Sequence, residues 1–209
     1  MRRIQLNAFA ERVDGLVLPL PFGGHPALDF CNTRAGWDDP RPGEYLETYD
    51  HLAVWAAANG LIEPRVAAGL RERADDHPRA ARWTLRHAIS FRDSLYSVWL
   101  DRSPGADWDA LAEEAGLAAA AAELELRGGH AEWVIPPRTG LRLPVLATAR
   151  AAADLLSTTT HGAVRACPGS DCGWLFLDRT GRRRWCTMAI CGNRAKARRH
   201  YARHRSGPS

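Results

Sequence analysis

The sequence predicts an α+β protein in two parts: a mainly helical N-terminal domain with a small β element, in residues 1–160, and a small cysteine-rich module in residues 161–209. Three observations support this division. Apolar residues recur at helical spacing through much of residues 44–158. Two short apolar stretches flank the dipeptide Gly128-Gly129, which is typical of a hairpin. Four of the five cysteines lie in a strongly basic C-terminal segment.

Charge is divided unevenly between these parts. Residues 165–209 carry 11 Arg and Lys residues against two Asp, whereas the remainder carries 17 basic and 22 acidic residues. A cationic module attached to an acidic domain suits a polyanionic partner such as a nucleic acid. The apolar content of 45% is sufficient for one sizeable core and a small satellite module.

The N-terminal segment lacks the features of a targeting signal. The chain begins with two arginines after Met1, but Glu11 and Asp14 interrupt the segment, and the apolar residues 16–22 include two prolines. No apolar stretch approaches the roughly 20 residues that span a bilayer. We therefore expect a cytoplasmic protein with no membrane partner, in which the thiols stay reduced.

The first structural signals are an extended segment and a polar box. The prolines in residues 16–22 favour an edge strand or an arm, and the Gly-Gly-His-Pro sequence at residues 23–26 favours a turn. Residues 28–33, Leu-Asp-Phe-Cys-Asn-Thr, then mix apolar and polar side chains. The polar side chains of this region are candidates to line a small-molecule pocket: His25, Asp29, Asn32 and Thr33. In the alternative, Asp29 or Asn32 caps a helix or ties down a turn.

Helical periodicity continues through the rest of the domain. It predicts helices at residues 44–59, 64–76, 78–100, 108–122 and 143–158. Between the last two, Leu124 and Leu126 and the apolar residues 133–135 predict two strands joined by a tight turn. Helix propensity falls at residues 158–162, which we take as the domain boundary.

The cysteines follow the pattern Cys167-x4-Cys172-x13-Cys186-x4-Cys191, which is zinc-ligand spacing. Disulfides and an iron–sulfur cluster are the alternatives. Reduced thiols argue against the first, and clusters use differently arrayed cysteines. Four thiolates leave no open position, so we expect one structural Zn²⁺ ion whose binding, on the order of 10 kcal/mol, is part of the module's folding free energy.

The residues around these ligands predict a treble-clef-like finger. Alternation through residues 174–178, a turn at 178–181 and a returning strand at 184–186 predict a two-stranded ribbon. Residues 192–205 lack proline and are rich in Ala and Arg, so a helix is expected to start at the last ligand. The fifth cysteine, Cys31, is expected to be a buried, small apolar residue.

Two motifs in this chain resemble those of one family. The sequences WCTM at residues 185–188 and CGNRAK at residues 191–196 are similar to the CGNR-type zinc finger of bacterial transcription regulators. LDFCNT at residues 28–33 resembles the LDFxNT box that opens the N-terminal ABATE domain of the same stress-induced regulators, with Cys31 where the family often has an apolar residue. The resemblance implies a DNA-binding finger and an N-terminal domain that senses a small-molecule effector or mediates assembly.

The basic residues of the module form two groups. The expected nucleic-acid contacts are Arg182, Arg183 and Arg184 near the hairpin tip, and Arg194, Lys196, Arg198, Arg199 and Arg203 along the final helix. A merely solvated helix would interleave acidic residues, and none follows Asp178. Asn193 and Arg194 have an alternative structural role, in which they cap the helix or interact with the thiolates.

These features give two hypotheses of different classes. The first is a zinc-dependent transcription regulator that binds double-stranded DNA, with an N-terminal domain open to a small-molecule effector. The second is an RNA- or protein-binding adaptor that uses the same basic finger. A homodimer suits the first, because one small finger reads few bases. The sequence has no nucleotide-binding glycine loop, no activated-serine motif and no His-Glu-x-x-His, so we do not expect an enzyme.

Overall fold

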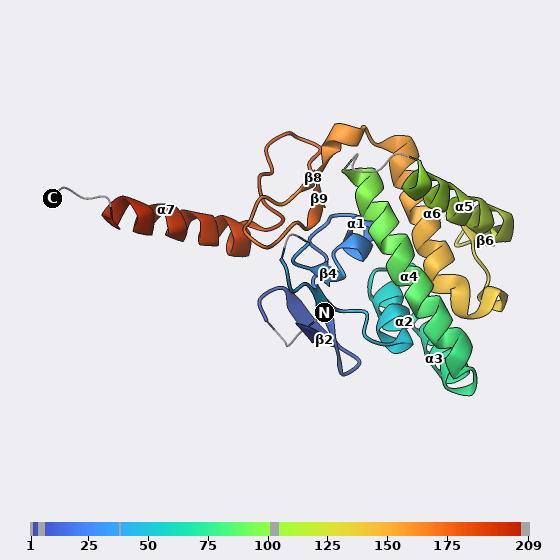
Figure 1. Ribbon diagram of the computed structural model, residues 1–209. Coiled ribbons are helices and arrows are strands. Elements are labelled where there is room, and N and C mark those ends of the chain that lie inside the picture. Colours follow the sequence, from blue (N-terminus) through green and yellow to red (C-terminus); the bar gives the residue numbers. More distant parts are fainter. Residues whose placement is uncertain (1, 4–6, 38, 101–104, 206–209) are drawn as a thin grey trace.

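A helical body carries a small C-terminal module from which one helix projects (Figure 1). The structure, a computed structural model, describes residues 2–3, 7–37, 39–100 and 105–205. The helices of the body are α1 (Pro26–Cys31), α2 (Tyr49–Ala58), α3 (Pro64–Asp76), α4 (Pro78–Trp99), α5 (Ala106–Ala121) and α6 (Leu143–Thr158). The projecting helix is α7 (Asn193–Arg205). The α+β class predicted from the sequence is confirmed.

Helix starts in the body follow local chemistry. Each of α3, α4 and α6 has a proline in its first turn, where the backbone N–H has no partner within the helix. The apolar residues of α4 and α6 repeat at helical spacing, so each presents one face to the core. Among the residues that the structure describes, every helix is too short or too polar to span a lipid bilayer.

The core of the body lies between α1, α2, α4 and α6. Phe30 of α1 is fully buried in this core, with its ring 5.1 Å from that of Trp55 and 6.1 Å from that of Phe91. Leu95 and Trp99 of α4 are also buried there. Side chains of this size contribute on the order of 1.5–3 kcal/mol each through burial. The short helix α1 is therefore fixed by tertiary packing rather than by its own length.

Within the described residues, the strands form four small sheets. β1 (Arg2–Arg3), β5 (Gly43–Glu44) and β4 (Arg34–Ala35) form one sheet in the order β1-β5-β4. The hairpins are β2 (Ala10–Val13) with β3 (Leu16–Pro19), β6 (Glu123–Arg127) with β7 (His130–Val134), and β8 (Val164–Ala166) with β9 (Leu175–Leu177). The expected hairpin around Gly128-Gly129 is confirmed, and both glycines have a positive φ.

The helix predicted from residue 44 is wrong in its first turn. Helix α2 begins only at Tyr49, whereas Glu44 belongs to β5. The Glu44 carboxylate accepts hydrogen bonds from the backbone N–H of Leu46, at 2.9 Å, and from the guanidinium of Arg92, at 2.7 Å. Because these bonds and the pairing of β5 with β4 fix an extended backbone, tertiary contacts outweigh the local helix propensity.

The C-terminal module packs directly on the body. Strand β9 lies against α1, and Leu175 and Leu177 belong to the main core. A second buried cluster joins the four cysteines, Trp174 and Phe176 to Ala10 and Tyr45 of the N-terminal segments. The connection between the two parts is a short 3-10 turn at His161–Ala163. The first half of the module is thus anchored to the body, whereas α7 extends beyond it (Figure 1).

Candidate zinc centre and cationic surface

The four cysteines converge from three segments. Cys167 and Cys172 lie in the segment between β8 and β9, Cys186 lies in the loop after β9, and Cys191 lies in a π-helical turn at Met188–Gly192 that leads into α7. All four are buried, and their Sγ atoms lie within 4.8 Å of one another. The Sγ atom of Cys186 is 3.7 Å from those of both Cys172 and Cys191.

These distances distinguish zinc from disulfide chemistry. A disulfide requires an S–S distance of about 2.05 Å, whereas Zn–S bonds of about 2.3 Å in a tetrahedron separate the sulfurs by about 3.8 Å. The observed 3.7 Å separations fit the tetrahedron. The four thiolates would hold the ion and would fill its coordination shell, so the site supplies structure and no open position for a substrate.

The turn between the first two ligands needs glycine. The N–H of Cys172 donates to the carbonyl of Gly169 at 3.0 Å, and the N–H of Cys167 donates to the carbonyl of Trp174 at 2.8 Å. A Cβ atom at Gly169 would lie 3.0 Å from the Sγ atom of Cys191. Glycine at position 169 therefore lets the backbone approach the thiols closely, whereas a larger residue would crowd the Sγ atom of Cys191.

The predicted ribbon of residues 174–178 with residues 184–186 is wrong. Strand β9 instead pairs antiparallel with β8, so the first cysteine pair lies at the turn of the hairpin. Asp178 then ends the strand: its carboxylate accepts from the backbone N–H of Arg182 at 3.1 Å and from Arg165 at 3.3 Å. These contacts turn the chain away from β9, and residues 184–186 return without strand pairing.

The guanidinium of Arg183 binds backbone carbonyls. It donates to the carbonyls of Phe22, Leu177, Trp185 and Cys186, and it stacks 4.8 Å from the ring centre of Phe176. Five N–H donors in a rigid fork allow one arginine to serve several acceptors. Although Arg183 was expected among the nucleic-acid contacts, the structure uses its donors to join the ligand loop to the N-terminal segment.

The other predicted cationic side chains are exposed. Arg182 and Arg184 lie on the loop before Cys186, and Arg194, Lys196, Arg198, Arg199 and Arg203 lie on α7. Four of them surround a hollow of about 280 Å³ beside the zinc knuckle: Arg184, Arg194, Arg198 and Arg199. The remaining lining comes from Pro168, Gly169, Ser170, Trp185, Cys191 and Ala195, so no carboxylate lines this hollow.

Asn193 and Arg194 make contacts within the module. The Asn193 amide donates to the carbonyl of Ala189 at 3.0 Å, which supports the passage from the π-helical turn into α7. The Arg194 guanidinium lies 5.3 Å from the ring centre of Phe9, in a cation–π contact. Asn193 thus has the helix-supporting role named as an alternative, whereas Arg194 both contacts the body and lines the hollow.

The four residues expected to line a ligand pocket are engaged within the fold. His25 caps α1, because its Nδ1 accepts from the N–H of Ala27 at 3.2 Å. Burial lowers the pKa of His25. Asp29 accepts from the N–H of Gly23 at 2.6 Å, and burial raises its pKa to about 7. Asp29 and His25 therefore fix the turn before α1, as the structural alternative expects.

The remaining two residues of that set are fully buried. Asn32 donates to the carbonyl of Leu175 at 2.9 Å and accepts from its N–H at 2.8 Å. The Thr33 hydroxyl donates to the carbonyl of Phe30 at 2.7 Å and accepts from Arg92 at 3.2 Å. These bonds connect the box to β9 and to α4, respectively.

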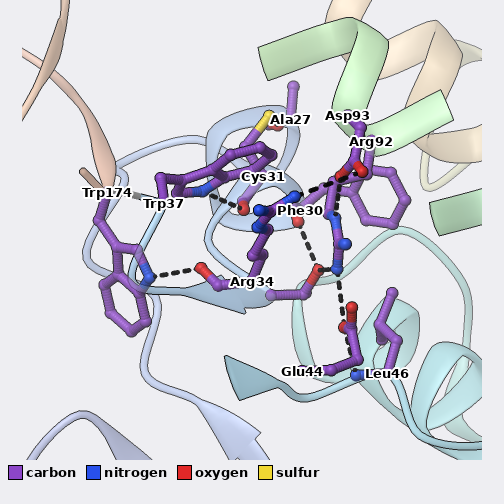
Figure 2. A network of polar contacts seen from close by, with 11 residues as sticks. Ala27, Phe30, Cys31, Arg34, Trp37, Glu44, Leu46, Arg92, Asp93 and Trp174 are labelled. Carbon is purple, nitrogen blue, oxygen red and sulfur yellow. Dashed lines mark hydrogen bonds and ion pairs between the residues drawn. The ribbon is translucent and has the colours of Figure 1, made fainter. Parts of the chain in front are cut away.

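A buried ion-pair network was not predicted from the sequence (Figure 2). Arg92 of α4 is fully buried and binds Glu44 at 2.7 Å and Asp93 at 3.1 Å. The available signal was an arginine within the apolar face that contains Phe91 and Leu95. Because a buried charge needs a partner, that position alone predicts a carboxylate nearby, but it does not identify Glu44.

The same network reaches the zinc module. Trp174 directly precedes β9, and Figure 2 shows its Nε1 directed at the carbonyl of Arg34. The distance between these two atoms is 2.9 Å. The Arg34 guanidinium pairs with Asp93 at 3.5 Å and lies 4.5 Å from the ring centre of Trp37. Trp37 in turn stacks on Tyr96 of α4 at 3.5 Å. Contacts thus run without a gap from α4 to the residues beside the cysteines.

Two family models match the chain. The model described as CGNR zinc finger matches residues 163–204. The ABATE model, described as "Putative stress-induced transcription regulator", matches residues 24–159, which is more than half of the chain. No curated protein matches it. The chain therefore belongs to the ABATE family, and its four clustered cysteines form one structural zinc site of a CGNR zinc finger.

Proposed function

We propose that this protein regulates transcription by binding double-stranded DNA through its zinc finger and α7. In this proposal residues 161–209 form the DNA-binding module, and residues 1–160 form the domain that positions and controls it. The family description names the process of transcription regulation, and a zinc finger with exposed cationic side chains supports DNA as the partner.

The convergence of Arg184, Arg194, Arg198 and Arg199 around one hollow carries the proposal. Four guanidinium groups with no lining carboxylate create a strongly positive site that has room for a phosphate group. Within the described residues, none of the four forms an ion pair. Their charges are therefore available to phosphates, whereas Arg183 donates to backbone carbonyls of the module and of Phe22.

Exposure of α7 supports a partner of DNA's shape. Its described side chains from Asn193 to Arg203 are exposed apart from the half-buried Ala195. The helix projects from the body (Figure 1), so its exposed side chains are accessible to a DNA groove. An α-helix fits the major groove of B-DNA. Lys196 and Arg203 extend the cationic surface beyond the hollow and add contacts to the phosphate backbone.

Zinc has an organising role in this proposal. Arg184 lies two residues before the ligand Cys186, and Arg194 lies three residues after the ligand Cys191. An ion shared by the two cysteines would hold the loop of Arg184 against the root of α7. Loss of the ion would release that constraint, so the arginines would no longer converge and DNA affinity would fall.

Binding to duplex DNA across a salt series tests the proposal. Zinc-loaded protein is expected to bind, with an affinity that falls linearly on a log-log plot by about 0.9 per phosphate contact. The triple variant Arg184→Gln, Arg198→Gln, Arg199→Gln is expected to lower the affinity and to reduce the slope by about three such contacts. Binding that is unaffected by salt and by this variant contradicts the proposal.

A matched control separates local contacts from net charge. Arg79, Arg82 and Arg86 are exposed on α4, and their replacement by Gln removes the same charge from the body. This control variant is expected to retain the salt slope. If the zinc-loaded protein ignores duplex DNA at low salt but retains another partner, the result favours an RNA- or protein-binding adaptor.

A further inference from the structure

A second cavity lies between the body and the root of α7. Its volume is about 550 Å³, within the range of roughly 300–1,000 Å³ that is usual for small-molecule sites. Three parts of the chain line it: the N-terminal segment and the loop around Gly36, the zinc knuckle from Ser170 to Trp174, and the face of α7 that contains Ala197. A ligand in this cavity would therefore touch the body, the knuckle and the projecting helix together.

Aromatic side chains form part of its wall. Phe9 packs edge-on against Trp174 with ring centres 5.2 Å apart, and Tyr45 lies 6.4 Å from the same indole. Tyr201 of α7 also lines the cavity, although 70% of its surface is exposed. Because most of the Tyr201 side chain is exposed, its ring face is accessible for packing against the ring of a ligand. The wall therefore favours a ligand with a flat aromatic group.

Charges of both signs face the cavity from different elements. Arg194 and Arg198 line it from α7, and Asp171 lines it from the zinc knuckle. Within the described part of the chain, none of these three forms an ion pair. A second carboxylate, that of Asp39, lines the body side. An anionic group is thus favoured at the helix and a cationic group at the knuckle.

We propose that this cavity binds a zwitterionic aromatic molecule of the class of the aromatic α-amino acids. The ligand carboxylate binds Arg194 and Arg198, its ammonium group binds Asp171, and its ring packs against Tyr201, next to the Phe9 ring on which the Arg194 guanidinium lies. Guanidinium–carboxylate bonds are charge-assisted and orient the ligand. The aromatic walls supply the apolar contact that makes up most of the surface of such sites.

The site also provides a means of regulation, which rests on the proposed DNA binding. Arg194 and Arg198 line both this cavity and the cationic hollow. A ligand carboxylate that engages them competes with DNA phosphates for the same charges. Because linkage is reciprocal, the ligand weakens DNA binding by the same factor by which DNA weakens ligand binding.

Calorimetry on the zinc-loaded full chain without DNA tests the site directly. L-tryptophan and L-phenylalanine serve as probes, tryptamine lacks the carboxylate, and indole-3-propionate lacks the ammonium group. L-tryptophan is expected to bind, and each of the two single-charge analogues is expected to bind at least about tenfold more weakly. The proposal is overturned if neither amino acid binds, or if tryptamine and indole-3-propionate bind as tightly as L-tryptophan.

Two variants locate the binding. Asp171 has a φ of 61°, a conformation that asparagine also tolerates, so Asp171→Asn removes the charge with little change in the backbone. It is expected to weaken L-tryptophan about tenfold and to leave indole-3-propionate unchanged. Ala197→Phe fills the cavity from an exposed helix position and is expected to abolish binding, whereas Ala202→Phe on the same helix retains it.

Measurement of DNA binding by the same protein separates this inference from the proposed function. If L-tryptophan binds and DNA does not, the ligand-binding proposal is supported and the DNA-binding proposal fails. If DNA binds and neither amino acid does, the DNA-binding proposal is supported and the ligand-binding proposal fails. When both bind, saturating L-tryptophan is expected to lower DNA affinity in the wild type and in Ala202→Phe, and to have no effect in Ala197→Phe.

Discussion

Asn32 of the helical body pairs with the backbone of Leu175 in the zinc module as if it were a neighbouring strand. Its side-chain amide donates to the carbonyl of Leu175 at 2.9 Å and accepts from the N–H of the same residue at 2.8 Å. Both residues are fully buried. One side chain thus satisfies two polar groups of β9 that would otherwise lack a partner, across 143 positions of sequence.

Replacement of Asn32 by alanine is therefore expected to destabilise the protein by about 2–5 kcal/mol, because two buried backbone groups lose their partners. Urea unfolding of the zinc-loaded protein measures the change. Asn59→Ala provides a control: the Asn59 amide makes one bond to the carbonyl of Trp55 at a half-buried position, and its loss is expected to cost about 1 kcal/mol. Equal costs for the two variants would contradict this account of Asn32.

The sequence predicted what depends on local patterns. Residues 64–76 and 143–158 are helical as expected, since proline starts and apolar spacing act within the segment. The zinc site follows from the spacing of the cysteines alone. In contrast, the partner of β9 was assigned wrongly, because β8 has only three residues, Val164–Ala166, and carries no periodic signal.

The roles of residues that act through long-range contacts could not be predicted from local sequence patterns either. Arg183 belongs to a run of three arginines, and nothing in that run distinguishes the one that binds carbonyls from its exposed neighbours. Arg92 is identifiable as an anomaly on an apolar helix face, but its partner Glu44 lies 48 residues away. Both assignments depend on tertiary placement, which a single sequence does not encode in any short segment.

Zinc is expected at one ion per chain, held by four of the five cysteines. In the native protein these four thiols are protected from a thiol reagent, and they react after the metal is chelated. Cys31 is fully buried, and burial raises the pKa of its thiol, so it reacts only on unfolding. Metal analysis is expected to show loss of zinc in Cys186→Ser and full occupancy in the matched control Cys31→Ala. If Cys31→Ala lost zinc and Cys186→Ser retained it, the assignment of the four zinc ligands would be wrong.

The buried pair of Arg92 and Glu44 provides a further prediction. Arg92→Met leaves the Glu44 carboxylate buried without its cation and is expected to cost about 3–5 kcal/mol of unfolding free energy. The double variant Arg92→Met, Glu44→Gln removes both charges and is expected to cost less than the sum of the single variants. The exposed pair of Arg65 and Glu63 serves as the comparison: Arg65→Met is expected to change stability by about 0–1 kcal/mol. Strict additivity at Arg92 and Glu44 would show that the pair is not coupled.

Asp29 gives stability a pH dependence of known sign. Burial raises its pKa from 3.8 to about 7, and the backbone N–H of Gly23 offsets only part of that effect. Between these two pKa values the folded state holds a proton that the unfolded state has lost, so the free energy of unfolding falls as pH rises through this window and levels off above it. In Asp29→Asn the side chain stays neutral at every pH and keeps an oxygen acceptor for the N–H of Gly23. The contribution of residue 29 to the fall in unfolding free energy with rising pH is therefore removed.

Urea unfolding of both proteins at saturating zinc, from about pH 5 to about pH 8, measures the effect, because the contributions of zinc and of His25 are common to both. Relative to Asp29→Asn, the wild type is expected to lose about 1.4 kcal/mol per pH unit within the window. Above the folded pKa the wild type carries a buried carboxylate, so Asp29→Asn is the more stable protein there. Parallel stability curves would mean that Asp29 ionises normally in the folded state and that the turn at Gly23 accommodates its charge.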